Sequence, residues 1–94
     1  MKLYDRVQNH IVVLGDGGTR KVLPIRKGPY GMAKTILGDF PQFFPNGVPR
    51  SLLVRFHQQL GEQERLTDLD VRLWLWKQPE LSRTGKPMGF IPAS

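Results

Sequence analysis

Residues 7–25 read VQNHIVVL, GDGG and TRKVLPI, and this segment constrains the fold more than any other part of the chain. Two runs rich in β-branched residues flank an Asp-Gly pair, which is a strong local signal for a β-hairpin. Pro24 has no amide hydrogen to donate, so the second strand is expected to be an edge strand or to end at that residue. We therefore predict a β-hairpin over residues 7–25.

A short helix and an aromatic segment follow the hairpin. Residues 32–37, MAKTIL, have the composition of a short helix that Gly38 can close. Residues 40–47, FPQFFPNG, then place three phenylalanines between prolines. Such a segment could form a binding surface, but in a small domain it more often fills the core, which is the interpretation that we favour.

The next segment has the pattern of a longer helix. Pro49 suits the first helical turn, and Gly61 ends the run. Between them the apolar residues recur at helical spacing: Leu52, Leu53, Phe56 and Leu60. We predict a helix over residues 49–60.

Residues 67–77 fit a helix better than a strand. Thr67 is a good N-cap, and acids in the first turn with Lys77 near the other end suit the helix dipole. The apolar residues support both structures, since Leu69, Leu73 and Trp76 have helical spacing and residues 69, 71, 73 and 75 also alternate. The cap, the dipole match and the absence of a turn signal favour the helix, with a strand as the alternative.

These elements predict one α+β domain over residues 1–94, in which the β-hairpin (7–25) precedes a mainly helical part (32–94) with two to three short helices and an irregular C-terminal tail. A chain of 94 residues has room for a single domain. The apolar residues of the tail are expected to pack back onto the helices: Leu81, Met88, Phe90 and Ile91. Cysteine is absent, and no apolar run approaches the roughly 18 residues of a membrane span, so we expect a cytoplasmic protein.

Positive charge is concentrated in one part of the sequence. Fourteen Lys and Arg against eight Asp and Glu give a formal net charge of +6. Between Asp16 and Asp39 the charged residues are all basic: Arg20, Lys21, Arg26, Lys27 and Lys34. This distribution favours a polyanion or an acidic protein surface as partner. For the two cations on the edge strand, protection against aggregation is an equally good explanation.

The motifs that enzymes need are not convincing in this chain. The GDGG turn lacks the spacing of a phosphate-binding loop and precedes a strand, whereas such loops lead into a helix. Asp68 and Asp70 are explained as acids in a first helical turn. His10 and His57 have no second ligand at metal-binding spacing. We therefore expect a binding protein without catalytic activity, metal or cofactor.

Four motifs from residue 40 onward occur in the order found in a known family: FPQFF (40–44), SLLVRFHQQL (51–60), LTDLDVRLWL (66–75) and RTGKPMG (83–89). This order resembles the RNA-chaperone domain of the ProQ/FinO family. The resemblance implies a basic concave surface that binds structured RNA, such as a terminator hairpin with its 3′ tail. Carried over by position, Arg72 and Arg83 would contact the RNA.

Two basic positions of that family are replaced here, by Leu53 and Trp76. An RNA-binding surface in this chain would then depend on the basic residues of the hairpin region and on further cations: Arg50, Arg55, Lys77 and Lys86.

Two function hypotheses follow. In the first, the protein binds nucleic acid, above all structured RNA, through phosphate contacts of its Arg and Lys residues and stacking of Tyr30 or a tryptophan on an unpaired base. In the second, it is an adaptor or inhibitor of the kind that phages and plasmids encode to block a host complex. Its basic face would then dock on an acidic protein surface, with Trp74 or Trp76 as anchor. A third reading assigns the charge to solubility alone.

Overall fold

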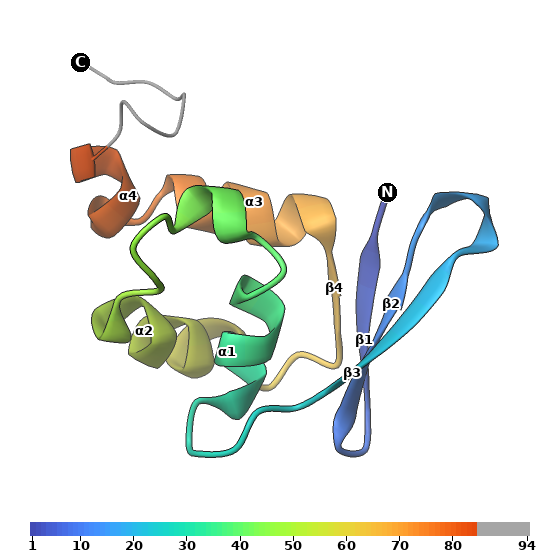
Figure 1. Ribbon diagram of the computed structural model, residues 1–94. Helices are drawn as coiled ribbons and strands as arrows, with labels where there is room; N and C mark the ends of the chain where they lie inside the picture. Colours follow the sequence, from blue (N-terminus) through green and yellow to red (C-terminus); the bar gives the residue numbers. More distant parts are fainter. Residues whose placement is uncertain (85–94) are drawn as a thin grey trace.

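The computed structural model describes the backbone of residues 1–84 and the side chains of residues 1–81. The described part contains four strands: β1 (Leu3–Val7), β2 (His10–Leu14), β3 (Arg20–Pro24) and β4 (Arg65–Thr67). It also contains four α-helices: α1 (Gly31–Leu37), α2 (Arg50–Leu60), α3 (Asp68–Trp76) and α4 (Pro79–Thr84). The predicted α+β class is confirmed (Figure 1).

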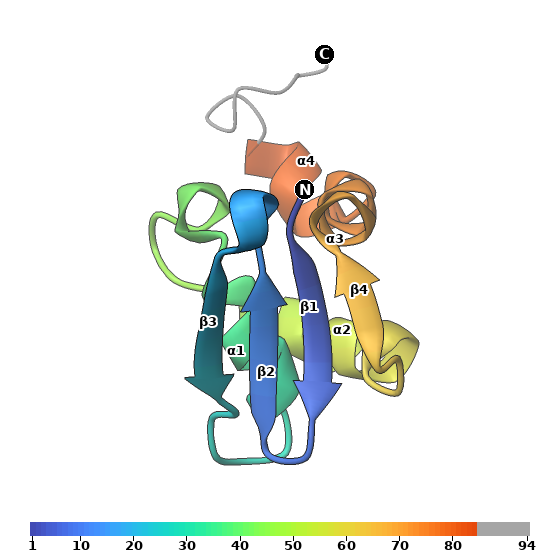
Figure 2. The same ribbon diagram turned by 90° about the vertical axis from the view of Figure 1, so that its right-hand side faces the viewer.

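The four strands form one antiparallel sheet in the order β3-β2-β1-β4 (Figure 2). Strand β1 lies in the middle of the sheet and brings the N-terminus beside residues 65–67, with Tyr4 opposite Leu66. Strand β3 is an edge strand and ends at Pro24, as predicted. The helices cover one face of this sheet and leave the other face uncovered (Figure 1).

The predicted hairpin exists with narrower bounds. Strands β2 and β3 pair from His10 to Pro24 around a 3₁₀ turn at Asp16–Gly18. Val7, which we assigned to the first strand of the hairpin, instead ends the preceding strand β1. The sequence analysis missed β1 because the turn that separates it from β2 contains only Gln8 and Asn9 and no glycine. Gln8 has a φ of +56°, a conformation that non-glycine residues seldom adopt.

The helical predictions agree with the structure in their main features. Helix α1 is closed by Gly38, and α2 begins at Arg50 with Pro49 as its N-cap. Residues 68–76 are helical, which excludes the strand alternative for them. Residues 79–84, the start of the segment expected to be irregular, form α4, so the described residues contain four α-helices where two to three were predicted. Met88, Phe90 and Ile91, expected to pack onto the helices, lie outside the described residues, and Leu81 is buried. Within residues 1–84, no helix has the length and apolar character needed to cross a membrane.

The core lies between the covered face of the sheet and the helices. The alternating pattern of β2 directs Ile11 and Val13 inward, where both are buried. The aromatic segment after α1 fills the core, as expected, through three buried side chains: Phe40, Phe43 and Phe44.

Helix α3 buries a face that we did not anticipate. Val71 and Leu75 are fully buried, whereas Leu69, Leu73 and Trp76 are 46%, 43% and 49% exposed. The apolar spacing thus identified the helix correctly without identifying the side that faces the core.

Candidate nucleic-acid interface

Two shallow hollows lie on the molecule beside the edge strand β3. The smaller hollow, of about 220 Å³, is lined by Lys2, Arg20 and Lys21 together with uncharged residues. The larger hollow, of about 270 Å³, lies between β3 and α1 and is lined by Arg26, Lys34, Asp39 and uncharged residues. We call the charged residues of the two hollows the β3–α1 surface: Lys2, Arg20, Lys21, Arg26, Lys34 and Asp39. The two hollows are thus lined by five cations and one carboxylate.

Asp39 joins the two hollows. Its Oδ1 accepts a hydrogen bond from Lys21 Nζ at 3.1 Å, and its Oδ2 accepts from the Tyr4 hydroxyl at 2.7 Å and from Lys2 Nζ at 3.3 Å. Burial acts to raise the pKa of Asp39, but the hydrogen bonds from Tyr4, Lys21 and Lys2 outweigh it and hold this pKa below its ordinary value. The carboxylate is thus charged at neutral pH and positions both lysines.

The loop before α1 holds the next cations. The Thr35 hydroxyl accepts a hydrogen bond from the Arg26 amide at 2.9 Å and donates to the Gly31 carbonyl at 2.8 Å. Gly31 permits this close packing, since a Cβ at that position would lie 1.9 Å from the Arg26 carbonyl oxygen. The loop is thereby fixed against the helix while the side chains of Arg26 and Lys27 remain exposed.

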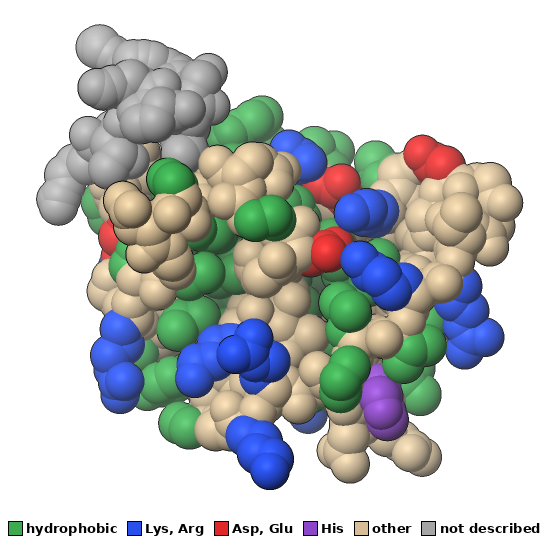
Figure 3. Space-filling model, viewed as in Figure 1, with side chains coloured by type: hydrophobic (Ala, Val, Ile, Leu, Met, Phe, Trp, Pro, Cys, Tyr) green, Lys and Arg blue, Asp and Glu red, His purple; other side chains and the backbone are tan. Residues whose placement is uncertain are grey.

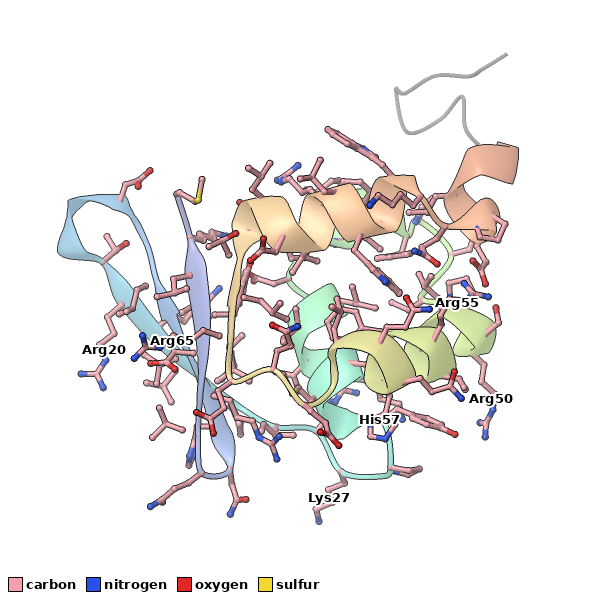
Figure 4. The ribbon with its side chains drawn as sticks, turned by 180° about the vertical axis from the view of Figure 1, so that it is seen from behind. Arg20, Lys27, Arg50, Arg55, His57 and Arg65 are labelled. Atoms are coloured by element: carbon pink, nitrogen blue, oxygen red, sulfur yellow. The ribbon has the colours of Figure 1, made fainter. Side chains whose placement is uncertain are left out.

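Tyr30 begins a second group of residues, which we call the Tyr30 cluster: Tyr30, Arg50 and His57. The Arg50 guanidinium carbon lies 5.7 Å from the centre of the Tyr30 ring, over its face. The ring of His57 meets Tyr30 edge to face at a centroid distance of 5.6 Å. Lys27, Arg50 and His57 occupy the side of the molecule formed by the loop and α2 (Figure 4). An aromatic ring flanked by cations is a suitable place for an unpaired base.

Within the described residues, no carboxylate forms an ion pair with Arg20, Arg26, Lys27, Lys34 or Arg50. Lys and Arg side chains are prominent on the face drawn in Figure 3, with few acidic groups between them. Arg20 is the first residue of β3, and its side chain extends away from the helices (Figure 4). These cations are therefore available for an anionic ligand.

Two of the predicted contact residues are engaged in the fold instead. Arg55 donates to Glu80 at 2.8 Å and to Gln78 at 3.0 Å, which ties α2 to α4. Arg72 pairs with Asp68 at 2.5 Å, and its guanidinium lies over the rings of Phe40 and Phe43. Arg72 is one of the two residues to which the family resemblance assigned RNA contact, and its contacts with Asp68, Phe40 and Phe43 support a packing role.

The remaining predicted residues are dispersed. Lys77 is exposed at the end of α3, and Trp76 is exposed on that helix. Trp74 packs edge to face on Phe56 and donates from Nε1 to Gln59 Oε1 at 2.8 Å. At least one tryptophan is thus exposed, as predicted. Arg83 belongs to α4, but its side chain, like all of Lys86, lies outside the described residues.

The sequence analysis missed Lys2 and Asp39. Lys2 enters the surface because β1 passes between β2 and β4, and this strand was not predicted. Asp39 follows α1 directly, and only the packing of α1 against β3 brings it to Lys21. A strand assignment for residues 3–7 would have placed Lys2 near the start of β3.

The arrangement is suited to holding an anion along a shallow, cationic surface. In the described part of the chain, no group of three or more His, Asp or Glu side chains could hold a metal ion. Comparison with protein-family models, with curated proteins and with solved structures found no match to this chain.

Proposed function

We propose that this protein binds nucleic acid, with structured RNA as the ligand class, and that the β3–α1 surface and the Tyr30 cluster form the contact area. The main support for this proposal is that five cations and one carboxylate line two neighbouring hollows. Phosphate contacts supply most of the affinity in such complexes, and shallow cationic surfaces favour them.

Two features support RNA within the nucleic acids, and a third favours a polymer over a small molecule. The order of the motifs from residue 40 onward resembles an RNA-chaperone family. Tyr30 lies beside the cations and is partly exposed, so that it can stack on a base next to a duplex end. The hollows are open and shallow, which suits a backbone lying across them better than it suits an enclosed small molecule.

The first test is a filter-binding titration with a hairpin RNA that carries a 3′ uridine tail, a duplex DNA and a scrambled single strand, at low and near-physiological salt. We expect the hairpin to bind most tightly. In the Arg26→Gln/Lys34→Gln double variant, affinity should fall by about tenfold, and the slope of log affinity against log salt should become shallower by roughly 1.5.

The matched control is Arg65→Gln. Arg65 is a strongly exposed cation on β4 that pairs with Asp5 at 3.5 Å and lines neither hollow. Its neutralisation lowers the net charge without touching the proposed surface, so affinity should change little. Equal losses in both variants would reduce the proposal to nonspecific charge attraction. Absence of binding to all three nucleic acids would reject it and favour a protein-binding adaptor.

A further inference from the structure

Helix α3 carries an exposed apolar stripe. Leu69, Leu73 and Trp76 follow one another at spacings of four and three residues, so they lie in one line along the helix. Each of them is between 43% and 49% exposed. Hydrophobic side chains also appear along the upper border of the molecule in Figure 3, where Figure 1 places α3. A continuous stripe of this kind on one helix is typical of a contact surface.

Opposite charges stand at the two ends of one flank of the stripe. Asp70 and Lys77 are seven residues apart, about two turns, and therefore share that flank. The Asp70 carboxylate accepts a hydrogen bond from the Thr67 amide, and Lys77 is exposed. On the other flank, Arg72 is neutralised by Asp68. The flank with Asp70 and Lys77 thus has a negative end and a positive end.

We propose that the stripe binds a second copy of this chain, with the two α3 helices antiparallel about a two-fold axis at Leu73. That axis places Leu73 against its equivalent and Leu69 against Trp76 of the second copy. It also places Asp70 opposite Lys77 of the second copy, since both pairs are centred within half a residue of Leu73.

Self-complementarity is the reason for choosing a second copy as the occupant. A two-fold contact uses the same patch on both subunits, so each feature must find its complement within that patch. An apolar centre at Leu73, with an acid three residues before it and a base four residues after it, meets this condition. In a parallel two-fold arrangement this flank would instead meet the Arg72 flank of the second copy, whose charge Asp68 already neutralises, so Asp70 and Lys77 would find no complement there. The inference is independent of the proposed nucleic-acid binding.

The test is sedimentation equilibrium of the full-length protein over a wide range of concentrations. We expect the mass to rise from that of one chain to that of two. Leu73→Glu should give a single chain at every concentration. The matched control is Val22→Glu, because Val22 is as exposed as Trp76 (49%) but lies on β3, and it should leave the association unchanged. Circular dichroism confirms that each variant is folded.

The charges provide a second, independent readout. Lys77→Glu places an acid opposite Asp70 and should weaken association on the order of tenfold, since two such pairs are changed. Adding Asp70→Asn removes the repulsion while the amide oxygen can still cap the helix, so part of the affinity should return.

Three results would overturn this inference. A single-chain mass at all concentrations excludes the dimer, and an association that Leu73→Glu leaves intact excludes the stripe as the contact. A monomer in which Phe90→Ser alters the emission of Trp76 would assign the stripe to residues 85–94 of the same chain.

Discussion

Asp39 is the residue at which stability and ligand binding oppose each other. Its carboxylate is mostly buried and holds Tyr4, Lys2 and Lys21 together. Burial and the hydrogen bond to Asp39 raise the pKa of Tyr4, so the phenol stays protonated and continues to donate. The same carboxylate neutralises part of the cationic surface.

For this reason Asp39→Asn is expected to change two properties in opposite directions. The amide can still accept from Tyr4 but no longer pairs with the lysines, so the free energy of unfolding should fall by about 1–2 kcal/mol. Affinity for hairpin RNA should rise severalfold, because both lysines become available for phosphate. Urea denaturation and filter binding measure the two effects. Asp5→Asn, on the uncovered face of the sheet, is the control for the loss of a carboxylate. If Asp39→Asn lowered both stability and RNA affinity, the assignment of the β3–α1 surface to RNA binding would be contradicted.

Among the elements, α3 shows how local signals define a helix before packing does. The Thr67 hydroxyl accepts a hydrogen bond from the Asp70 amide at 3.0 Å, and the Asp70 carboxylate accepts one from the Thr67 amide at 3.0 Å. In the sequence, Thr67 as N-cap, the dipole match and the absence of a turn signal favoured the helix; the structure contains the cap and adds its reciprocal half, the Asp70 carboxylate.

Removing the cap should therefore weaken α3. Thr67→Ala is expected to lower the free energy of unfolding by about 1 kcal/mol, as measured by urea denaturation followed by circular dichroism. Thr67→Ser keeps a hydroxyl in the same position and should lose much less. If both substitutions cost the same, the methyl group of Thr67 and not its hydroxyl would be the stabilising part.

The ion pair between Arg55 and Glu80 attaches helix α4 to α2, and its contribution to stability depends on pH. The hydrogen bond from Arg55 and, to a smaller extent, the one from Ser51 lower the pKa of Glu80 to about 2, although burial opposes them. A carboxyl group whose pKa is lower in the folded state stabilises the fold above its unfolded pKa and loses that effect as pH falls.

We therefore expect the difference in stability between the wild-type protein and Glu80→Gln to be greatest near neutral pH. This difference should shrink as pH falls from about 4.5 toward 2. Thermal denaturation of both proteins across this range measures it. Parallel curves for the two proteins would show that the Arg55–Glu80 pair does not stabilise the attachment of α4.

The elements that could be predicted from the sequence are those with strong local signals. The GDGG turn, Pro24, Gly38, Pro49 and Thr67 all lie at the element ends that they predicted. Strands β1 and β4 escaped prediction, since β4 has three residues and β1 ends at a turn formed by Gln8 and Asn9. The site was predicted in part for the same reason. The cations between Asp16 and Asp39 are close in sequence, whereas Lys2 reaches them only through the sheet.

At the scale of the whole molecule, the sheet joins the first residues of the chain to residues 65–67, which lie between α2 and α3. Leu3 pairs with Thr67 and Tyr4 with Leu66, so the strand that begins the chain is held by a segment more than sixty residues later. The hairpin and the helical part, which the sequence presents as successive units, thus share one sheet and one core. The smaller hollow depends on this closure, because Lys2 lines it and lies just before β1.

Because the sheet and the helices share one core, we expect them to unfold cooperatively. Leu66 is 3% exposed in β4, and Leu66→Ala should lower the free energy of unfolding by about 2–5 kcal/mol. Amide hydrogen exchange should show the same loss of protection in β2 as in α3, since one core supports both elements. If the amides of β2 keep their protection while those of α3 lose it, the hairpin unfolds as a separate unit. The β3–α1 surface would then be divided between a hairpin that stays folded and helix α1, which unfolds. RNA affinity in Leu66→Ala should in that case fall in proportion to the population in which the helical part is folded.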